Sequence, residues 1–197
     1  MNIITVAGML GSGKTSVILK LIDPMIAAGI KVAVIENDFG ELGVDSEVLE
    51  KNGMPVRDLK GGCICCTLQS GLVDSLRMLE SSYDPKYVIV EPTGIADPEM
   101  VIRSVTDVDG VHIDDKTTLI VVDCERFQKF RKMFERPLKN QLRTADVALL
   151  NKIDTVSESD LDEIVEGLRS FGYEGPCMKV QADSGDGMDQ VLEVIRR

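Results

Sequence analysis

Residues 8–15 have the sequence GMLGSGKT, and this stretch decides the fold class. It follows the apolar run Ile3–Ala7, which is typical of a β-strand, and precedes Val17–Ala28, whose apolar residues have helical spacing. The pattern G-x-x-x-x-G-K-[ST] between a strand and a helix predicts a phosphate-binding loop, because backbone N–H groups and the positive end of the helix dipole then surround the phosphates. The alternative is a glycine-rich turn without a ligand, and the flanking strand and helix argue against it.

Each residue type in this loop suits a nucleotide. Glycine permits tight curvature and lets the backbone approach a ligand closely. The ammonium of Lys14 can reach the β- and γ-phosphates, and the hydroxyl of Thr15 can bind Mg²⁺. The nucleotide-binding residues predicted in this loop are Gly8, Gly11, Ser12, Gly13, Lys14, Thr15 and Ser16.

The remaining chain alternates short apolar runs with amphipathic stretches. Further strands are predicted at Lys31–Ile35, Tyr87–Val90, Thr118–Val122, Val147–Leu150 and Cys177–Val180. Further helices are predicted at Gln69–Leu79, Glu99–Val105, Phe127–Leu142 with a break near Pro137, Glu158–Phe171 and Met188–Ile195. Apolar strands without alternation, separated by helices, indicate a parallel sheet covered on both faces. We therefore predict one α/β domain over residues 1–197, a three-layer sandwich with a mostly parallel sheet and the P-loop NTPase fold.

One long segment, Asp38–Lys60, is harder to assign. It contains a possible short helix at Ser46–Lys51 and a possible strand at Met54–Leu59. Such a long connection in an α/β domain is usually functional.

The composition narrows the classes of partner. The chain has 33 acidic and 22 basic residues, for a net charge of −11, and such a surface repels phosphate backbones, so we expect no nucleic-acid binding. No apolar run is long enough to span a membrane and the N-terminus does not resemble a signal peptide, so we expect a cytoplasmic protein without membrane contact. In that compartment, five cysteines indicate metal binding, redox chemistry or burial rather than disulfides.

A second part of the predicted site follows the apolar strand at 87–90. Glu91 ends this strand and PTG follows, so the carboxylate can hold Mg²⁺ and the N–H of Gly94 can meet a γ-phosphate. Asp123 ends another apolar strand and is the alternative Mg²⁺ ligand. A surface acid without a ligand is the other interpretation of Glu91.

The base is indicated by ADVALLNKID at 145–154, which ends in N-K-x-D after a strand. A carboxylate accepts two hydrogen bonds from the N–H and NH₂ groups of guanine, whereas adenine lacks that edge, so Asp154 would select guanine. Asn151 would brace the loop and the stem of Lys152 would lie along the base. In VQADSGDG, residues 180–187, the N–H of Ala182 would meet the guanine oxygen. N-K-x-D alone also occurs in ordinary polar loops.

The cysteines are concentrated in KGGCICCT, residues 60–67. In an extended stretch Cys63 and Cys65 face one side and Cys66 the other, and two thiolates on one side suit Zn²⁺. Zn²⁺ usually takes four ligands, and we expect Glu36, Glu41 or water to complete the site. The alternatives are a redox pair or buried thiols. Cys124 and Cys177 have apolar neighbours and are expected in the core, and His112, the single histidine, is expected at the surface.

These motifs occur in an order that resembles the CobW family of P-loop GTPases, relatives of the HypB and UreG nickel-insertion GTPases. The motifs are GMLGSGKT, ENDFGELGVD, GGCICCT, EPTGIADP and QLRTADVALLNKID. The resemblance implies a SIMIBI-class GTPase that delivers or inserts a transition metal, usually Zn²⁺ or Co²⁺. It implies that the three adjacent thiols lie near the Mg²⁺ end of the nucleotide, that nucleotide state tunes metal affinity, and that the protein dimerises across nucleotide.

Two features depart from the family pattern. EPTG stands where E-T-T-G is usual, and Pro92 stiffens that loop. Family members usually carry a second, C-terminal CobW domain, often with a histidine-rich stretch, and we expect none here: the chain is either a minimal form or a piece of a longer protein. Statements about partner docking therefore do not carry over.

We therefore predict a GTP-hydrolysing metallochaperone that binds GTP or GDP, Mg²⁺ and either Zn²⁺ or Co²⁺. Its partners would be a client metalloprotein or corrinoid enzyme and a second copy in a nucleotide- or metal-dependent homodimer. Lys14, Thr15, Glu91 and Gly94 would carry the catalysis. The alternatives are a GTPase that assists a corrinoid or methyltransferase enzyme, a nucleotide-dependent metal or redox regulator, and a small-molecule kinase.

Overall fold

The computed structural model describes residues 1–36, 56–58, 68–94, 96–106 and 109–196. In this part of the chain, parallel strands form one sheet in the order β3-β2-β4-β1-β5-β6-β7. The strands are β1 (Asn2–Gly8), β2 (Val32–Glu36), β3 (Val56–Asp58), β4 (Tyr87–Glu91), β5 (Asp115–Asp123), β6 (Val147–Asn151) and β7 (Cys177–Lys179). The helices are α1 (Lys14–Ala27), α3 (Leu68–Ser82), α4 (Pro98–Ser104), α5 (Phe127–Met133), α6 (Glu135–Arg143), α7 (Glu158–Ser170) and α8 (Met188–Ile195). A short 3₁₀ turn, η1 (Ile153–Thr155), follows β6.

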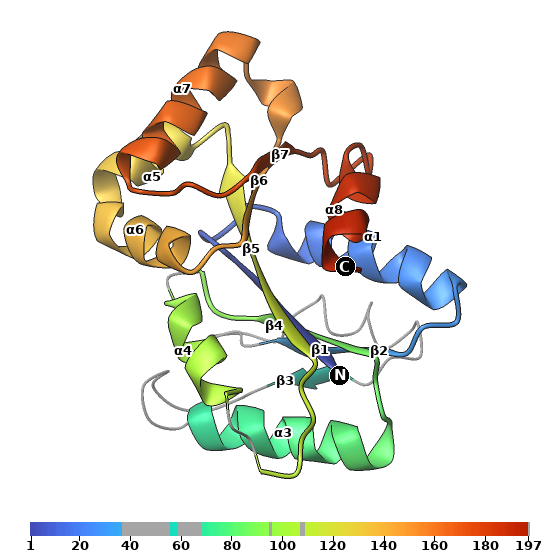
Figure 1. Cartoon of the computed structure of the whole chain (residues 1–197). Helices are drawn as coiled ribbons and strands as arrows, with labels where there is room; N and C mark the ends of the chain where they lie inside the picture. Colours follow the sequence, from blue (N-terminus) through green and yellow to red (C-terminus); the bar gives the residue numbers. More distant parts are fainter. Residues whose placement is uncertain (37–55, 59–67, 95, 107–108, 197) are drawn as a thin grey trace.

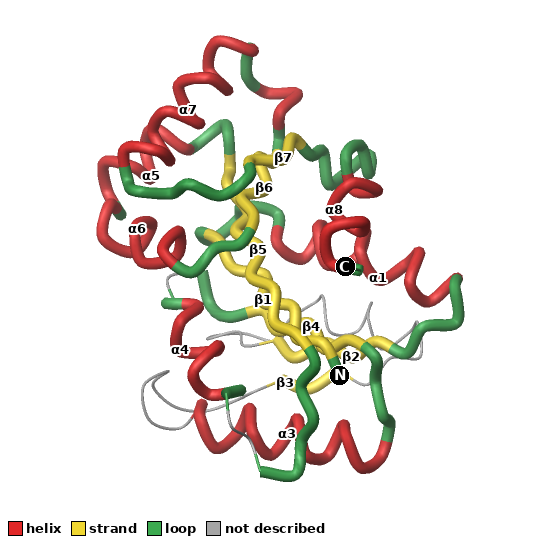
Figure 2. Tube along the Cα trace, viewed as in Figure 1, coloured by secondary structure: helices red, strands yellow, loops and turns green. Residues whose placement is uncertain are grey.

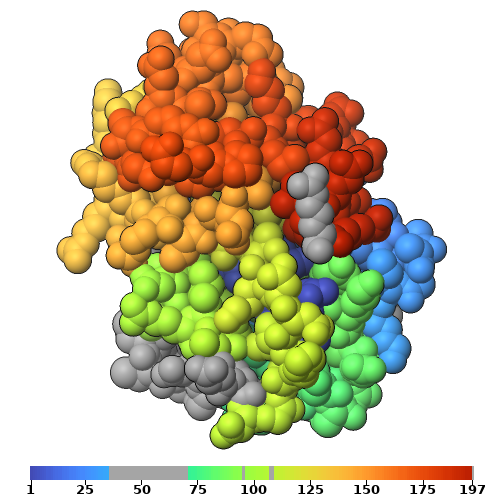
Figure 3. Space-filling view, in the orientation of Figure 1, coloured from blue at the N-terminus to red at the C-terminus, as the bar shows by residue number. Residues whose placement is uncertain are grey.

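The helices cover both faces of the sheet, as Figure 2 shows. Because side chains alternate along a strand, Ile4 and Val6 of β1 pack with α1 and α8 on one face, whereas Ile3 and Ala7 point to the other face. That second face is covered by α3 beside β2 and β4, and by α5, α6 and α7 beside β5 and β6 (Figure 1). The central strand β1, dark blue in Figure 3, is almost hidden beneath these layers. The predicted three-layer α/β sandwich with a parallel sheet is confirmed.

Two predicted boundaries need correction. The helix expected to break near Pro137 breaks earlier, at Phe134, between α5 and α6. Pro137 lies instead in the first turn of α6, where a missing N–H costs no intrahelical hydrogen bond. β5 starts at Asp115, earlier than the predicted Thr118, because polar residues at its beginning hid the strand from the apolar pattern.

The long segment Asp38–Lys60 is described only at β3, which lies inside the strand predicted at Met54–Leu59. The helix predicted at Ser46–Lys51 lies outside the described residues. None of the helices in the described part of the chain combines the length and the apolar content that are needed to span a lipid bilayer.

The register of the parallel strands brings several polar residues to one edge of the sheet. Glu36 is paired with Glu91 across β2 and β4, and Asp123 with Asn151 across β5 and β6. β1 ends at the same edge, because Gly8 is level with Val121 of β5. Loops that follow these strands therefore meet at the carboxyl edge, where ligands bind in open α/β sheets.

Candidate functional site

A cavity of about 520 Å³ lies at the carboxyl edge of the sheet. It lies between the β1–α1 turn, the loop after β4 and the loops after β6 and β7. Its lining includes the predicted residues Gly11, Gly13, Lys14, Thr15, Ser16, Glu91, Gly94, Asn151 and Lys152. Five further residues line the cavity that were not predicted as site residues, namely Leu10, Leu19, Pro92, Thr93 and Asp183. The cavity thus joins residues that are up to 173 positions apart in the sequence, Leu10 and Asp183.

The β1–α1 turn has the geometry of an anion cradle. Gly13 caps α1 with a φ of 93°, and a Cβ placed there would lie 2.4 Å from Nδ2 of Asn151. The first turn of α1 carries no acidic residue, and its N–H groups have no intrahelical acceptor. These donors and the positive helix end face the cavity together, which suits a phosphate.

A buried cation stands beside this turn. Nζ of Lys14 lies 3.5 Å from Oε1 of Glu91, and the side chains are 8% and 15% exposed. The loop after β4 approaches the turn closely, because a Cβ on Gly94 would lie 2.7 Å from the backbone nitrogen of Leu10. Glycine at position 94 therefore allows the two loops to touch.

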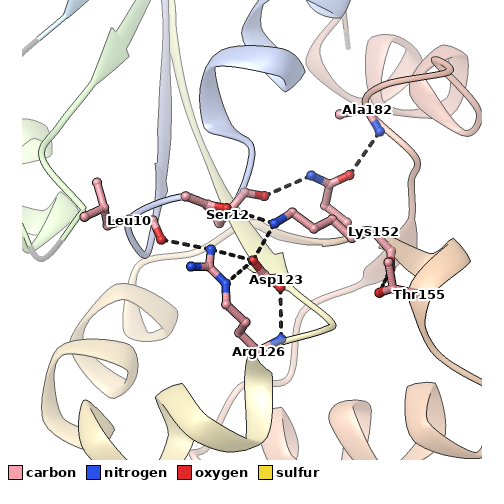
Figure 4. A network of polar contacts seen from close by, with 9 residues as sticks. Leu10, Ser12, Asp123, Arg126, Lys152, Thr155 and Ala182 are labelled. Atoms are coloured by element: carbon pink, nitrogen blue, oxygen red, sulfur yellow. Dashed lines mark hydrogen bonds and ion pairs between the residues drawn. The ribbon is translucent and has the colours of Figure 1, made fainter.

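Three consecutive carbonyl groups of the turn accept hydrogen bonds from side chains at the ends of β5 and β6 (Figure 4). Leu10 accepts from Nη2 of Arg126 at 3.1 Å, and Gly11 accepts from Nζ of Lys152, also at 3.1 Å. Ser12 accepts from Nδ2 of Asn151 at 2.9 Å. The turn is therefore held in shape by the protein itself, so that a ligand meets preorganised N–H groups.

Asp123 holds two of these donors in place. Its Oδ2 accepts from Nζ of Lys152 at 2.8 Å and from Nε of Arg126 at 2.8 Å, and its Oδ1 accepts from the N–H of Arg126 at 3.0 Å. Burial alone would raise the pKa of Asp123, but the hydrogen bonds from Lys152 and Arg126 outweigh it and hold that pKa below its ordinary value. Both carboxylate oxygens of Asp123 are therefore engaged by donors of the protein itself.

The loop after β6 is braced by one amide. Asn151 is buried, and its Oδ1 accepts the N–H of Ala182 at 3.0 Å while its Nδ2 contacts the phosphate-binding turn. The N–H of Ala182 was expected to meet a guanine oxygen, but here Asn151 accepts it. Asp154 is exposed in η1, and no hydrogen bond or ion pair joins it to another described residue.

Orphaned polar atoms test whether a nucleotide fits. Within the described residues, Oγ of Ser12 and Oγ1 of Thr93 are buried without a hydrogen-bond partner. Both residues belong to the loops around the cavity. Buried polar groups normally have partners, so these hydroxyls fit a polar ligand. The oxygen donors of Thr15 and Glu91 both line the cavity and are the type that Mg²⁺ prefers.

Arg126 and Asp183 are two charged residues near the cavity that were not predicted from the sequence. Arg126 follows Asp123 by three positions, a spacing that allows the ion pair but does not reveal the carbonyl of Leu10 as a partner. Asp183 lies within VQADSGDG, the segment predicted to contact the base, so that motif could have indicated its position on the cavity wall.

Comparison with protein families decides the identification. The sequence profile of the CobW/HypB/UreG nucleotide-binding domain matches residues 2–178. The chain belongs to the CobW/HypB/UreG family. The resemblance inferred from the motifs is confirmed.

Two curated relatives illustrate the family. The zinc chaperone CobW of Sinorhizobium sp is 30% identical over 216 residues, which cover 95% of this chain and 60% of that protein. The zinc chaperone YeiR of Escherichia coli (strain K12) is 34% identical over 164 residues, which cover 81% of this chain and 48% of that protein. The chain therefore spans about half to three-fifths of the length of these relatives.

Solved structures show the same fold. The hydrogenase maturation factor HypB of Archaeoglobus fulgidus matches with a TM-score of 0.72 at 16% identity, covering 100% of this chain and 89% of that one. The Zn(II)-bound YjiA GTPase of E. coli matches with a TM-score of 0.58 at 24% identity, covering 85% of this chain and 54% of that one.

The thiol segment of this CobW-family chain, residues 60–67, lies outside the described residues. Cys63, Cys65, Cys66 and Glu41 are outside the described residues, and Glu36 is described only as the last residue of β2. Among the described residues, no three His, Cys, Asp or Glu side chains are grouped as a metal site.

The other thiols and the histidine agree with their expected places. Burial and the Asp123 charge raise the pKa of the buried Cys124 to about 12, and burial raises the pKa of the half-buried Cys177. His112 is exposed and lies 3.0 Å from Asp114.

Proposed function

We propose that this chain is the GTPase part of a metallochaperone. It binds and hydrolyses GTP and thereby controls its affinity for a transition metal, Zn²⁺ or Co²⁺. The metal is then delivered to a client protein. One observation carries the nucleotide part. The phosphate-binding turn, Lys14, and Asn151 and Lys152 of the N-K-x-D loop all border one cavity of about 520 Å³.

At the phosphate end, the chain supplies positive charge and fixed donors. The ammonium of Lys14 is largely buried, so its attraction for the β- and γ-phosphates is screened little by solvent. The N–H groups of Lys14, Thr15 and Ser16 open α1 and would donate to phosphate oxygens. Mg²⁺, when bound, would neutralise phosphate charge, and the oxygens of Thr15 and Glu91 would hold it. Positioning and charge neutralisation supply most of the catalysis in phosphoryl transfer.

At the base end, Asp154 would choose guanine. Asn151 and Lys152 hold the loop against the phosphate-binding turn, so the base and the phosphates are recognised by one connected unit. The exposed carboxylate of Asp154 follows Lys152 by two positions and would accept the N–H and NH₂ groups of guanine. Adenine offers no such pair of donors, so ATP would bind weakly.

We propose that Cys63, Cys65 and Cys66 bind the transition metal, with Glu36 or Glu41 as further ligands. In support, the backbone of Glu36 is in register with Glu91 on the neighbouring strand, which borders the nucleotide cavity. β3 ends at Asp58, level with Glu36, and Cys63 follows five positions later in the sequence. We propose that a metal held by these residues responds to the nucleotide state. The client would be a metalloprotein or a corrinoid enzyme, and a homodimer across nucleotide is part of the proposal.

Phosphate release tests the enzymatic part. Purified chain with Mg²⁺ should release inorganic phosphate from GTP without any acceptor and much faster than from ATP. Lys14→Ala should reduce the GTP rate by about two orders of magnitude or more, because the charge that stabilises the transferred phosphoryl group is lost. Transfer of phosphate to a small-molecule acceptor, or equal use of ATP, would contradict the proposal.

A further inference from the structure

Gln141 of α6 is a buried polar side chain that contacts the loop after β4. Its Nε2 donates to the carbonyl oxygen of Gly94 at 3.1 Å and to that of Ala96 at 3.2 Å. The side chain is 0% exposed. Because both acceptors are carbonyl oxygens, the NH₂ group and not the amide oxygen must face them. One side chain thus links α6 to a loop 45 or more positions earlier in the chain.

The same loop touches the phosphate-binding turn on its other side. A Cβ on Gly94 would lie 2.7 Å from the nitrogen of Leu10 and 3.1 Å from its Cα. Gly94 is therefore confined between the turn that surrounds the phosphates and the amide of Gln141. Packed contacts of this kind transmit small displacements, because protein interiors have low compressibility.

A second connection between α6 and this region is weaker. Arg143 forms ion pairs with Asp97, at 3.6 Å, and with Glu99, and its side chain is 60% exposed. Solvent screens such exposed pairs, and they contribute little. The hydrogen bond from Gln141 to Ala96 is buried and the one to Gly94 is partly buried, and the low local dielectric there strengthens them. Gln141 is accordingly the residue through which α6 holds the loop.

We propose that Gln141 is a positioning residue that makes the loop after β4 responsive to the γ-phosphate, and that α6 reports the nucleotide state. This inference rests on the proposed GTPase function. A γ-phosphate that attracts the N–H of Gly94 shifts a residue whose carbonyl is tied to Gln141, and GDP lacks that group. The loop then has one position with the γ-phosphate and another without it, and α6 moves with the loop. A ligand shifts such an equilibrium only if it interacts differently with the two states, and the contact between the γ-phosphate and Gly94 is that difference.

On its outer side, α6 borders a second cavity. Lys139, Asn140 and Arg143 line a second cavity, of about 440 Å³, against residues 171–175. A shift of α6 changes the shape of that cavity.

The substitution Gln141→Met tests the proposal, because it keeps the length and apolar bulk of the side chain and removes both donors. Affinities for GDP and for a non-hydrolysable GTP analogue would be measured by calorimetry, together with kcat and KM for GTP. We expect the analogue to bind about tenfold more weakly and GDP to bind within about twofold of the wild type. The unchanged GDP affinity would also show that the variant is folded.

Leu142→Ala is the matched control. Leu142 is the buried neighbour of Gln141 on α6 and packs in the hydrophobic core between the sheet and α5, α6 and α7. It should lower Tm and leave the ratio of the two affinities unchanged.

A second variant, Gln141→Glu, gives a readout that packing alone cannot produce. Burial raises the pKa of a carboxyl group, and its protonated form can donate one of the lost hydrogen bonds. Analogue affinity should therefore recover as pH is lowered from about 8 to about 6.

The outcomes separate the two proposals. If the wild type binds neither nucleotide, the proposed function fails and this inference fails with it. If the wild type binds both, an equal loss of GDP and analogue affinity in Gln141→Met overturns this inference alone. A changed ratio of GDP affinity to analogue affinity in Leu142→Ala would overturn it as well. So would an analogue affinity of Gln141→Glu that does not depend on pH.

Discussion

Asp154 stands out at the residue scale because its carboxylate is exposed and has no hydrogen-bond partner among the described residues. We predict that Asp154→Ala weakens GTP and GDP binding by about 1–3 kcal/mol and leaves the weak ATP binding unchanged, because only guanine loses hydrogen bonds. Calorimetry with the three nucleotides measures the effect. Asp162→Ala removes the same charge from an exposed position of α7 and should change none of the affinities. An unchanged preference for GTP in Asp154→Ala would rule out this role.

Asp123 has a different task, because it joins Lys152 and Arg126 to the phosphate-binding turn. Its side chain is fully buried, whereas Lys152 and Arg126 are 29% and 36% exposed, so solvent compensates part of any loss. We predict that Asp123→Asn lowers the free energy of unfolding by about 1–3 kcal/mol at neutral pH. Denaturant unfolding followed by circular dichroism measures it.

The pKa of Asp123 also determines how the stability difference between wild type and Asp123→Asn changes with pH. The pKa of Asp123 is lower in the folded chain than its ordinary value of 3.8, so its contribution to stability is present above that value and is lost as pH falls through the folded-state pKa. The gap between wild type and Asp123→Asn should be constant above about pH 5 and narrow below about pH 4. A gap that widens on acidification would contradict the ion-pair assignment.

Among the elements, the turn between β1 and α1 offers a comparison of two glycines. Gly13 and Gly172 both have positive φ, 93° and 85°, but only Gly13 lacks room for a Cβ, with Asn151 2.4 Å away. We predict that both Gly→Ala variants lose about 1–2 kcal/mol of stability from backbone strain, and that only Gly13→Ala also loses nucleotide binding. Thermal unfolding and titration with a fluorescent GDP analogue measure the two effects. Normal nucleotide affinity in Gly13→Ala would contradict the anion cradle.

The elements also show what could be predicted from sequence. The strand–GMLGSGKT–helix unit and the strand before N-K-x-D have local patterns, and both were predicted within a few residues. The ties between Arg126 and Leu10, or between Asn151 and Ala182, join residues far apart in the chain and depend on strand order, which no local pattern contains. For the same reason Gln141 was missed: on α6 it is one polar residue on a helix, and its acceptors lie 45 or more positions away.

For the whole molecule, sheet order explains how an acidic chain can hold a triphosphate. The net charge is −11, yet Lys14, Lys152 and the N-terminus of α1 meet at one edge of the sheet. The acidic ends of β2 and β4, Glu36 and Glu91, lie side by side at that edge. Phosphate recognition is therefore local.

The most direct measurement is a Zn²⁺ competition titration of the wild-type chain with saturating GDP and with a non-hydrolysable GTP analogue. We predict about tenfold tighter Zn²⁺ binding with the analogue, within the usual range of coupling between two sites, and loss of that difference in Cys65→Ala. Equal Zn²⁺ affinity in the two nucleotide states would contradict the claim that the nucleotide controls the metal.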